Sequence, residues 1–244
     1  MIAYPQLQQR RIGKVQIIDV KGDLTGPWAL KLKSELSAIL KNEVQNAVII
    51  NLSLLRQIDS LGVKVLIESI GNRSECALLN GNLSVMDMVN TVSLPHGVSV
   101  LRNEDDLVQR FGKYLVSDKP SESDKRKFAR MHTALVLKFK CTDKKEKPLE
   151  FHAIVTNLSE GGLFAEYINI QDIERSQSAV NPFELQMLDL EVKLPNKQSI
   201  FACGKVVRRK LDGEQVGIGM EFYKIDKANK EKLQAFLALH ETAE

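Results

Sequence analysis

The sequence AVIINLSLLRQIDSLGVKVL, residues 47–66, is the most informative stretch of the first half of the chain. It opens with a short apolar run, passes through a polar turn at Asp59 and Ser60, and then shows apolar residues at helical spacing. A short apolar strand followed by a helix is typical of a sheet that helices cover on its faces. The stretch therefore predicts an α/β domain.

The flanking segments repeat this alternation of strand and helix. Upstream, residues 15–20 indicate a strand, and a helix follows Gly26. Downstream, we expect a strand at CALLN, residues 76–80, a helix around residues 85–92 and a last helix that includes residues 107–111. The first half should therefore form one sheet with several covering helices.

Hydrophobic periodicity disappears in LVSDKPSESDK, residues 115–125, where Pro, Ser and charged residues collect. This composition is typical of a solvated connector. A chain of 244 residues is also long enough for two cores, because domains cluster at roughly 100 to 150 residues. We therefore predict a first domain at residues 1–116, a linker at residues 117–125 and a second domain at residues 126–244.

The second half has a different period. Six segments are rich in β-forming residues and are separated by turn signals, at residues 134–141, 150–157, 162–168, 184–194, 199–211 and 214–225. Six strands in about a hundred residues indicate a small antiparallel barrel. An amphipathic helix with Leu233, Phe236 and Leu237 on its apolar stripe follows. The second domain should be an all-β, six-stranded antiparallel barrel with a C-terminal helix.

The composition favours a cytoplasmic protein. Hydrophobic residues make up 43% and charged residues 27%, and no apolar run approaches the roughly 20 residues that span a bilayer. The N-terminus lacks the apolar segment of a secretory signal. A net charge of +3 and an aromatic content of 6% disfavour a nucleic-acid partner. We expect neither a membrane span nor a nucleic-acid interface.

No sequence pattern points to catalysis or metal binding. The chain lacks a P-loop, HExxH and GxSxG, and its four histidines show no ligand-like spacing. Cys76, Cys141 and Cys203 lie far apart in apolar stretches, which favours buried free thiols. We therefore predict a non-enzymatic protein without catalytic residues, metal or cofactor.

The segment KRKFAR, residues 125–130, contains two arginines that can converge. Arg126 and Arg130 are four residues apart, so their side chains lie on one side in either a helix or a strand. Guanidinium groups pair bidentately with phosphate oxygens or with guanine O6 and N7. Taken alone, two solvated arginines in a basic linker would produce the same pattern.

A second polar element is NLSEGG, residues 157–162. Asn157 and Ser159 lie two residues apart at the end of a strand and should point the same way. Gly162 permits a tight turn and a close approach of the backbone. On its own this segment also fits an ordinary polar hairpin turn.

Together with GKVVRR, residues 204–209, and VGIGMEF, residues 216–222, these two elements resemble the PilZ domain. That family combines a basic RxxxR loop, a (D/N)xSxxG turn, a six-stranded barrel and a C-terminal helix, and it binds cyclic di-GMP. The resemblance implies that cyclic di-GMP is the ligand of the second domain.

The resemblance also implies roles for individual residues. Arg126 and Arg130 would contact phosphate and the guanine edge, whereas Asn157, Ser159 and Gly162 would shape the opposite wall. Two guanidinium groups and a neighbouring hairpin would then enclose the dinucleotide. Whether one ligand or a stacked pair binds stays open.

The DSLG turn in the first half has two interpretations. Asp and Ser are favoured caps of helix N-termini, so capping alone explains Asp59 and Ser60. The first half, from residues 15–26 to residues 103–111, also resembles the STAS domain of anti-sigma-factor antagonists. That resemblance implies a partner-docking turn at Asp59, Ser60 and Gly62, which an anti-sigma factor or a kinase-like regulator would contact.

In the STAS family a Ser or Thr beside this turn is phosphorylated, and the added charge breaks the partner interface. Alignment on Asp59 and Gly62 places this position at Leu61, with Ser60 one residue early. Leucine has no hydroxyl group, so we favour a docking domain that has lost the switch. Phosphorylation of Ser60 stays an alternative.

Two functions follow from these resemblances. The first is a bacterial second-messenger effector that binds cyclic di-GMP on the barrel and relays this to a protein partner docked on the STAS-like domain. The alternative is a phosphorylation-controlled anti-sigma-factor antagonist whose barrel is a passive interaction module.

Overall fold

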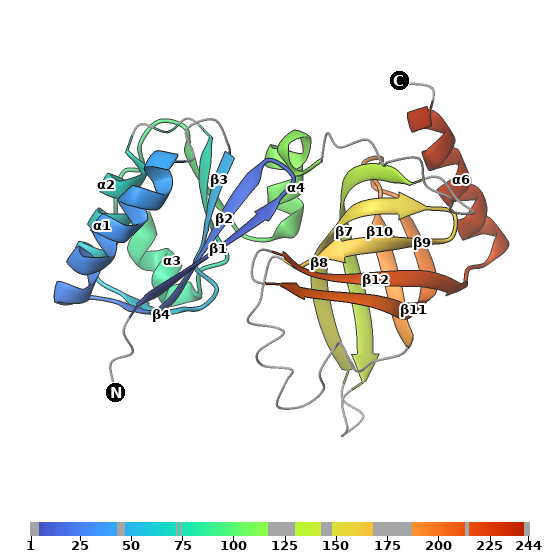
Figure 1. The fold of residues 1–244 in the computed structure, drawn as a ribbon, viewed down its shortest axis with the longest axis horizontal. Coiled ribbons are helices and arrows are strands. Elements are labelled where there is room, and N and C mark those ends of the chain that lie inside the picture. The colour runs from blue at the N-terminus through green and yellow to red at the C-terminus, as the bar shows by residue number, and fades with distance from the viewer. Residues whose placement is uncertain are drawn as a thin grey trace. The chain divides into compact units, whose positions relative to one another are not determined.

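The computed structural model describes residues 5–42, 47–71, 73, 75–116, 130–142, 148–167, 187–212 and 215–241. The chain divides into two compact units, Met1–Leu107 and Val108–Glu244. Figure 1 shows helices packed on a sheet in the first unit and a barrel in the second. The linker predicted at residues 117–125 lies outside the described residues, so the predicted domain bounds stay a prediction.

The first unit is built on a mixed six-stranded sheet. Its elements in chain order, the last of which continues into the second unit, are β1 (Gln6–Ile12), β2 (Val15–Leu24), α1 (Gly26–Asn42), β3 (Ala47–Asn51), β4 (Leu55–Ile58), α2 (Ser60–Ile70), β5 (Cys76–Leu79), α3 (Leu83–Asn90), β6 (Val98–Leu101) and α4 (Glu104–Leu115). The strand order is β1-β2-β3-β5-β6, and the end of β2 also pairs with β4. Only the β1–β2 pair is antiparallel among these described strands. The predicted α/β architecture is confirmed.

The core of this unit lies between the sheet and its helices. All five residues of β3 are buried, as expected for a strand covered on both faces. Leu36 of α1 and Leu66 of α2 are fully buried in one cluster with Ile18 and Ile50 of the sheet. The strand β1 was not predicted because its sequence, QLQQRRI, is mostly polar and exposed, as an edge strand allows.

The second unit is a closed barrel of six antiparallel strands followed by a helix. Its elements are β7 (Met131–Thr142), β8 (Pro148–Ser159), β9 (Gly162–Glu166), β10 (Met187–Lys193), β11 (Ser199–Asp212), β12 (Gln215–Lys224) and α6 (Lys227–Glu241). The order around the barrel is β10-β11-β12-β9-β8-β7, and β7 pairs with β10 to close it. All six predicted strands and the C-terminal helix are confirmed.

Aromatic side chains pack together within a largely aliphatic barrel interior. The rings of Phe139 and Phe151 stack with centroids 5.2 Å apart, and Tyr167 meets Phe139 edge-on at 5.8 Å. Leu233 of α6 is buried against this core.

None of the helices in the described part of the chain has the length and apolarity that a membrane crossing needs.

The cysteines differ in burial. Cys76 of β5 is a buried free thiol, and desolvation raises its pKa to about 12. Cys203 of β11 is also a free thiol but is only half-buried, because it lies on the outer face of the barrel. The prediction of buried thiols is therefore right for Cys76 and wrong for Cys203, and the side chain of Cys141 lies outside the described residues.

Candidate ligand site on the barrel

A bulge in β8 directs the polar residues of the NLSEGG segment to the outer face of the barrel. Val155 and Leu158 both belong to the core although they are three residues apart, because the pairing of β8 with β9 shifts between Val155 and Asn157. Asn157 and Ser159 flank Leu158 and therefore lie on the opposite face of the strand.

The turn between β8 and β9 is held by hydrogen bonds and by a close backbone approach. Ser159 Oγ donates to the carbonyl oxygen of Gly162 over 3.1 Å, and the backbone N–H of Phe222 donates to the carbonyl of Gly161 over 2.9 Å. A Cβ atom on Gly162 would lie 2.2 Å from the carbonyl oxygen of Met220. Only glycine fits here, because β12 passes directly beside the turn.

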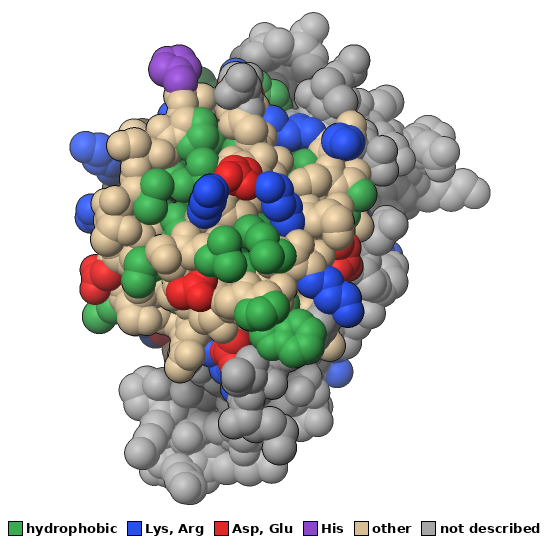
Figure 2. All heavy atoms as spheres, turned by 90° about the vertical axis from the view of Figure 1, so that its left-hand side faces the viewer, with side chains coloured by type: hydrophobic (Ala, Val, Ile, Leu, Met, Phe, Trp, Pro, Cys, Tyr) green, Lys and Arg blue, Asp and Glu red, His purple; other side chains and the backbone are tan. Residues whose placement is uncertain are grey.

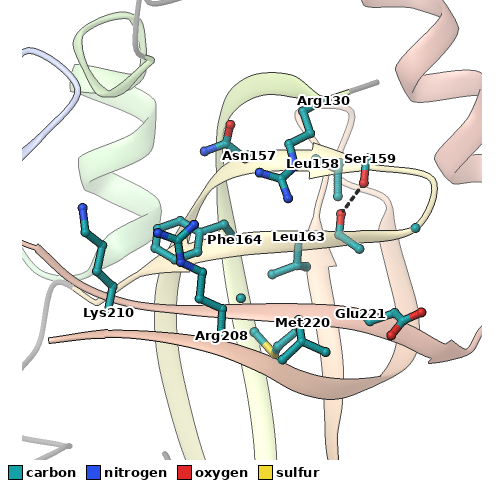
Figure 3. Close-up of a pocket in the computed structure, with 14 residues that line it drawn as sticks. Arg130, Asn157, Leu158, Ser159, Leu163, Phe164, Arg208, Lys210, Met220 and Glu221 are labelled. Atoms are coloured by element: carbon teal, nitrogen blue, oxygen red, sulfur yellow. Dashed lines mark hydrogen bonds between the residues drawn. The ribbon is translucent and has the colours of Figure 1, made fainter. Parts of the chain in front are cut away.

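A cavity of about 580 Å³ opens on this outer face (Figure 3). It is lined by residues of β8, β9, β11 and β12 and by Arg130, which directly precedes β7. The structure thus brings together Arg130, Asn157, Ser159 and Gly162, four of the five residues predicted to bind the ligand. The fifth, Arg126, lies outside the described residues.

Two further cationic residues line the cavity and were not predicted. Arg208 and Lys210 of β11 lie two residues apart and face the same cavity (Figure 3). The basic run KVVRRK was a visible signal, but the pairing of β11 with β12 shifts between Val206 and Arg208. Without that register, the sequence does not say which basic side chains share a face with Asn157.

The described lining favours an anion that also carries apolar surface. It contains three cations, Arg130, Arg208 and Lys210, and one acidic residue, Glu221. Phe164 and the exposed Val207 add apolar surface. Guanidinium groups bind phosphate in a planar, bidentate manner, and an aromatic ring offers a stacking surface for a base.

The predicted docking turn of the first unit has a clear structural role. Asp59 caps α2, accepting from the backbone N–H of Gly62 over 2.7 Å, and it also accepts from the N–H of Gly26 over 2.8 Å. One carboxylate therefore joins the N-termini of α1 and α2. A Cβ atom on Gly62 would lie 2.1 Å from the carbonyl oxygen of Leu24, so this glycine is required for packing.

Ser60 differs from its neighbours in being exposed. It is the first residue of α2, whereas Leu61 is partly buried against the core and Gly62 is buried. Asp59 and Gly62 thus build the turn, and the structure leaves Ser60 as its accessible hydroxyl group.

The helices around this turn carry exposed apolar side chains. Trp28 and Leu30 of α1 are 39% and 56% exposed, and Leu83 at the start of α3 is 85% exposed. Figure 2 shows the side of the molecule on which α1 and α2 lie, with apolar side chains gathered beside a few charged ones.

An exposed ion pair links the same two helices. Lys33 of α1 donates to Glu68 of α2 over 2.5 Å, and this hydrogen bond lowers the pKa of Glu68 below its ordinary value.

The barrel matches a known protein family. Residues 124–239 match the PilZ domain family. The match confirms the resemblance predicted from the basic segment and the NLSEGG turn. No curated protein matches the chain.

Solved structures with a similar fold correspond to either half of the chain. The inhibitor of motility MotI of Bacillus subtilis is 15% identical, with a TM-score of 0.38 over 52% of this chain and 58% of its own. The PilZ domain of Escherichia coli YcgR with c-di-GMP is 16% identical, with a TM-score of 0.34 over 49% of this chain and 95% of its own. The anti-sigma factor antagonist SpoIIAA is 18% identical, with a TM-score of 0.33 over 43% of this chain and 95% of its own. Of the first of these structures, MotI, the chain thus covers little more than half of the length.

Proposed function

We propose that this chain, whose residues 124–239 form a PilZ domain, is a non-enzymatic, cytoplasmic bacterial effector that binds cyclic di-GMP. The observation that carries the proposal is the convergence of Arg130, Asn157, Ser159 and Gly162 on one cavity of the outer barrel face. The YcgR domain with a related fold was solved with c-di-GMP, and we extend that ligand to this chain.

The chemistry of the cavity suits this ligand. Cyclic di-GMP carries two phosphates, which guanidinium groups bind, and two guanines, whose O6 and N7 atoms accept from arginine. Gly162 lets the turn pack against β12 at the edge of the cavity, and Asn157 supplies both a donor and an acceptor. Arg126, four residues before Arg130, is proposed to contact the same ligand.

Calorimetry with cyclic di-GMP tests the proposal. The double variant Arg126→Ala/Arg130→Ala removes two charge-assisted contacts and should weaken binding by about a hundredfold or more. Arg209→Ala is the matched control, since Arg209 is exposed on β11 but does not line the cavity. Unchanged affinity in the double variant would remove the proposed site.

We further propose that the first unit docks a protein partner, such as an anti-sigma factor or a kinase-like regulator, around Asp59, Ser60 and Gly62. Exposed Trp28 and Leu83 offer apolar contact area of the kind that protein interfaces bury. If ligand binding and partner binding are coupled, each changes the affinity of the other by the same factor. A pull-down from the native cell with and without cyclic di-GMP tests this coupling, and a yield indifferent to the nucleotide contradicts it.

The alternative function is a phosphorylation-controlled antagonist. The exposure of Ser60 at the first position of α2 supports it, because a helix N-terminus tolerates the charge of a phosphate. Phosphate transfer to Ser60 by a partner kinase, without any binding of cyclic di-GMP to the barrel, would favour this alternative.

A further inference from the structure

We propose that Arg208 and Lys210 form a second cationic wall of the cavity and contact the half of cyclic di-GMP that lies farther from the NLSEGG turn. This inference rests on the proposed function and assigns part of its specificity to β11. Neither residue belongs to the RxxxR or the (D/N)xSxxG motif.

The strand register places Arg208 in one row with Asn157. Across neighbouring strands, Asn157 pairs with Phe164, Phe164 pairs with Gly219, and Gly219 pairs with Arg208. Adjacent strands lie about 4.8 Å apart, so this row spans roughly 14 Å of the barrel surface. Figure 3 shows the Arg208 side chain beside the Phe164 ring and Lys210 at the same end of the cavity.

Glycines of β12 let the Phe164 ring and the Arg208 side chain lie close over this strand. A Cβ atom on Gly219 would lie 3.0 Å from Cβ of Arg208 and 3.6 Å from Cδ2 of Phe164. Gly217 pairs with Lys210, and a Cβ atom there would lie 2.6 Å from Cζ of Phe164. The Phe164 ring therefore covers β12, and a guanine base that stacks on this ring can reach the cationic side chains of β11.

The charges divide the cavity into two ends. Glu221 pairs with Gly162 and lines the cavity near the turn, where its carboxylate offsets part of the positive charge of Arg130. Arg208 and Lys210 lie on β11, beyond β12, and together attract a phosphate. The phosphate of the farther ligand half should therefore meet Arg208 and Lys210.

This arrangement predicts selectivity for a dinucleotide. A mononucleotide bound at Arg130 and Asn157 reaches only one end of the row, whereas cyclic di-GMP reaches both. Loss of the second wall should therefore weaken cyclic di-GMP binding but leave competition by GMP unchanged.

The test compares variants of the full chain by calorimetry with cyclic di-GMP and by competition with GMP. Arg208→Ala/Lys210→Ala should raise the Kd for cyclic di-GMP about tenfold to hundredfold, whereas Arg209→Ala should leave it unchanged. Arg208→Lys keeps the charge but loses the planar fork, so its Kd should lie between those of the unsubstituted chain and Arg208→Ala. Thermal unfolding of each variant checks that the barrel stays folded.

The outcomes separate this inference from the proposed function. If Arg126→Ala/Arg130→Ala loses binding but Arg208→Ala/Lys210→Ala binds as the unsubstituted chain does, the proposed ligand site is supported. The inferred role of Arg208 and Lys210 is then wrong. An equal loss for GMP and cyclic di-GMP would also overturn it, because the residues would then shape the whole site. Absence of cyclic di-GMP binding by the unsubstituted chain overturns both.

Discussion

The DSLG turn of the first unit and the NLSEGG turn of the barrel look alike locally but use their polar groups differently. In both turns a neighbouring carbonyl oxygen leaves no room for a Cβ atom, at 2.1 Å for Gly62 and 2.2 Å for Gly162. Both carboxylate oxygens of Asp59 accept hydrogen bonds from backbone N–H groups of its own unit, whereas Asn157 lines a cavity. The carboxylate of Asp59 is thus used within the fold, whereas the amide of Asn157 lines the candidate ligand site.

Arginines show the same contrast. Arg10 in the first unit is 2% exposed and bonds Asp19 through two contacts of 2.6 and 2.8 Å, with Asn51 adding a third hydrogen bond to the carboxylate. Arg208 in the barrel is exposed and lines the cavity. The first unit therefore uses guanidinium for its own stability, and the barrel presents it toward a ligand.

Removal of the buried carboxylate should have the largest effect. Asp19→Ala removes the carboxylate that Arg10 bonds while the guanidinium group stays buried, so the free energy of unfolding should fall by about 3–5 kcal/mol in urea titrations. Lys33→Ala is the exposed counterpart, because it breaks the ion pair with Glu68 at the surface, and it should cost far less. Similar losses in both variants would remove the contrast between buried and exposed pairs.

Methyl groups added at the two turn glycines should have the next largest effect. Gly62→Ala and Gly162→Ala each force a Cβ against a carbonyl oxygen and should destabilise their own unit by on the order of 3 kcal/mol. Hydrogen exchange read by mass spectrometry reports which unit opens. Gly112→Ala in α4 is the control: its nearest contact would be 3.9 Å away, and it should be neutral or stabilise by up to about 1 kcal/mol.

Truncation of the turn side chains sharpens the functional contrast. Asp59→Ala removes the acceptor of two backbone N–H groups and should cost about 1–2 kcal/mol without changing the Kd for cyclic di-GMP. Ser159→Ala removes one hydrogen bond, costs about 1 kcal/mol and should weaken ligand binding. Equal effects of both variants on the Kd would contradict separate roles for the two turns.

The surface pair should give the smallest effect, which is present at neutral pH and disappears in acid. The hydrogen bond from Lys33 holds the folded-state pKa of Glu68 below its ordinary value of 4.5. Its contribution to stability is therefore present above about pH 4.5 and is lost as pH falls through the lower folded-state pKa. The unfolding temperature of Glu68→Gln should match that of the parent at low pH and lie slightly below it at neutral pH. A difference that persists at low pH would point to another cause.

The pattern of elements was predictable where burial leaves a local signature. The barrel strands were found because their segments are rich in β-forming residues between turn signals, and the strand β3 was found because it is a continuous apolar run. The strand β1 was not found, because its polar edge sequence carries no such spacing. In the candidate site, the motif residues Arg130, Asn157, Ser159 and Gly162 were predicted, but Arg208 was not.

The two kinds of fold, the order of most of their elements and the polar motifs can be predicted from the sequence, since spacing within a segment is a local property. That Arg208 shares a row with Asn157 follows from the folded barrel, because it depends on bulges in β8 and β11 and on the register across four strands. The cap by which Asp59 joins two helices is likewise visible only in the folded chain. Pairing between distant segments follows from the packing of the whole unit, so no single stretch encodes it.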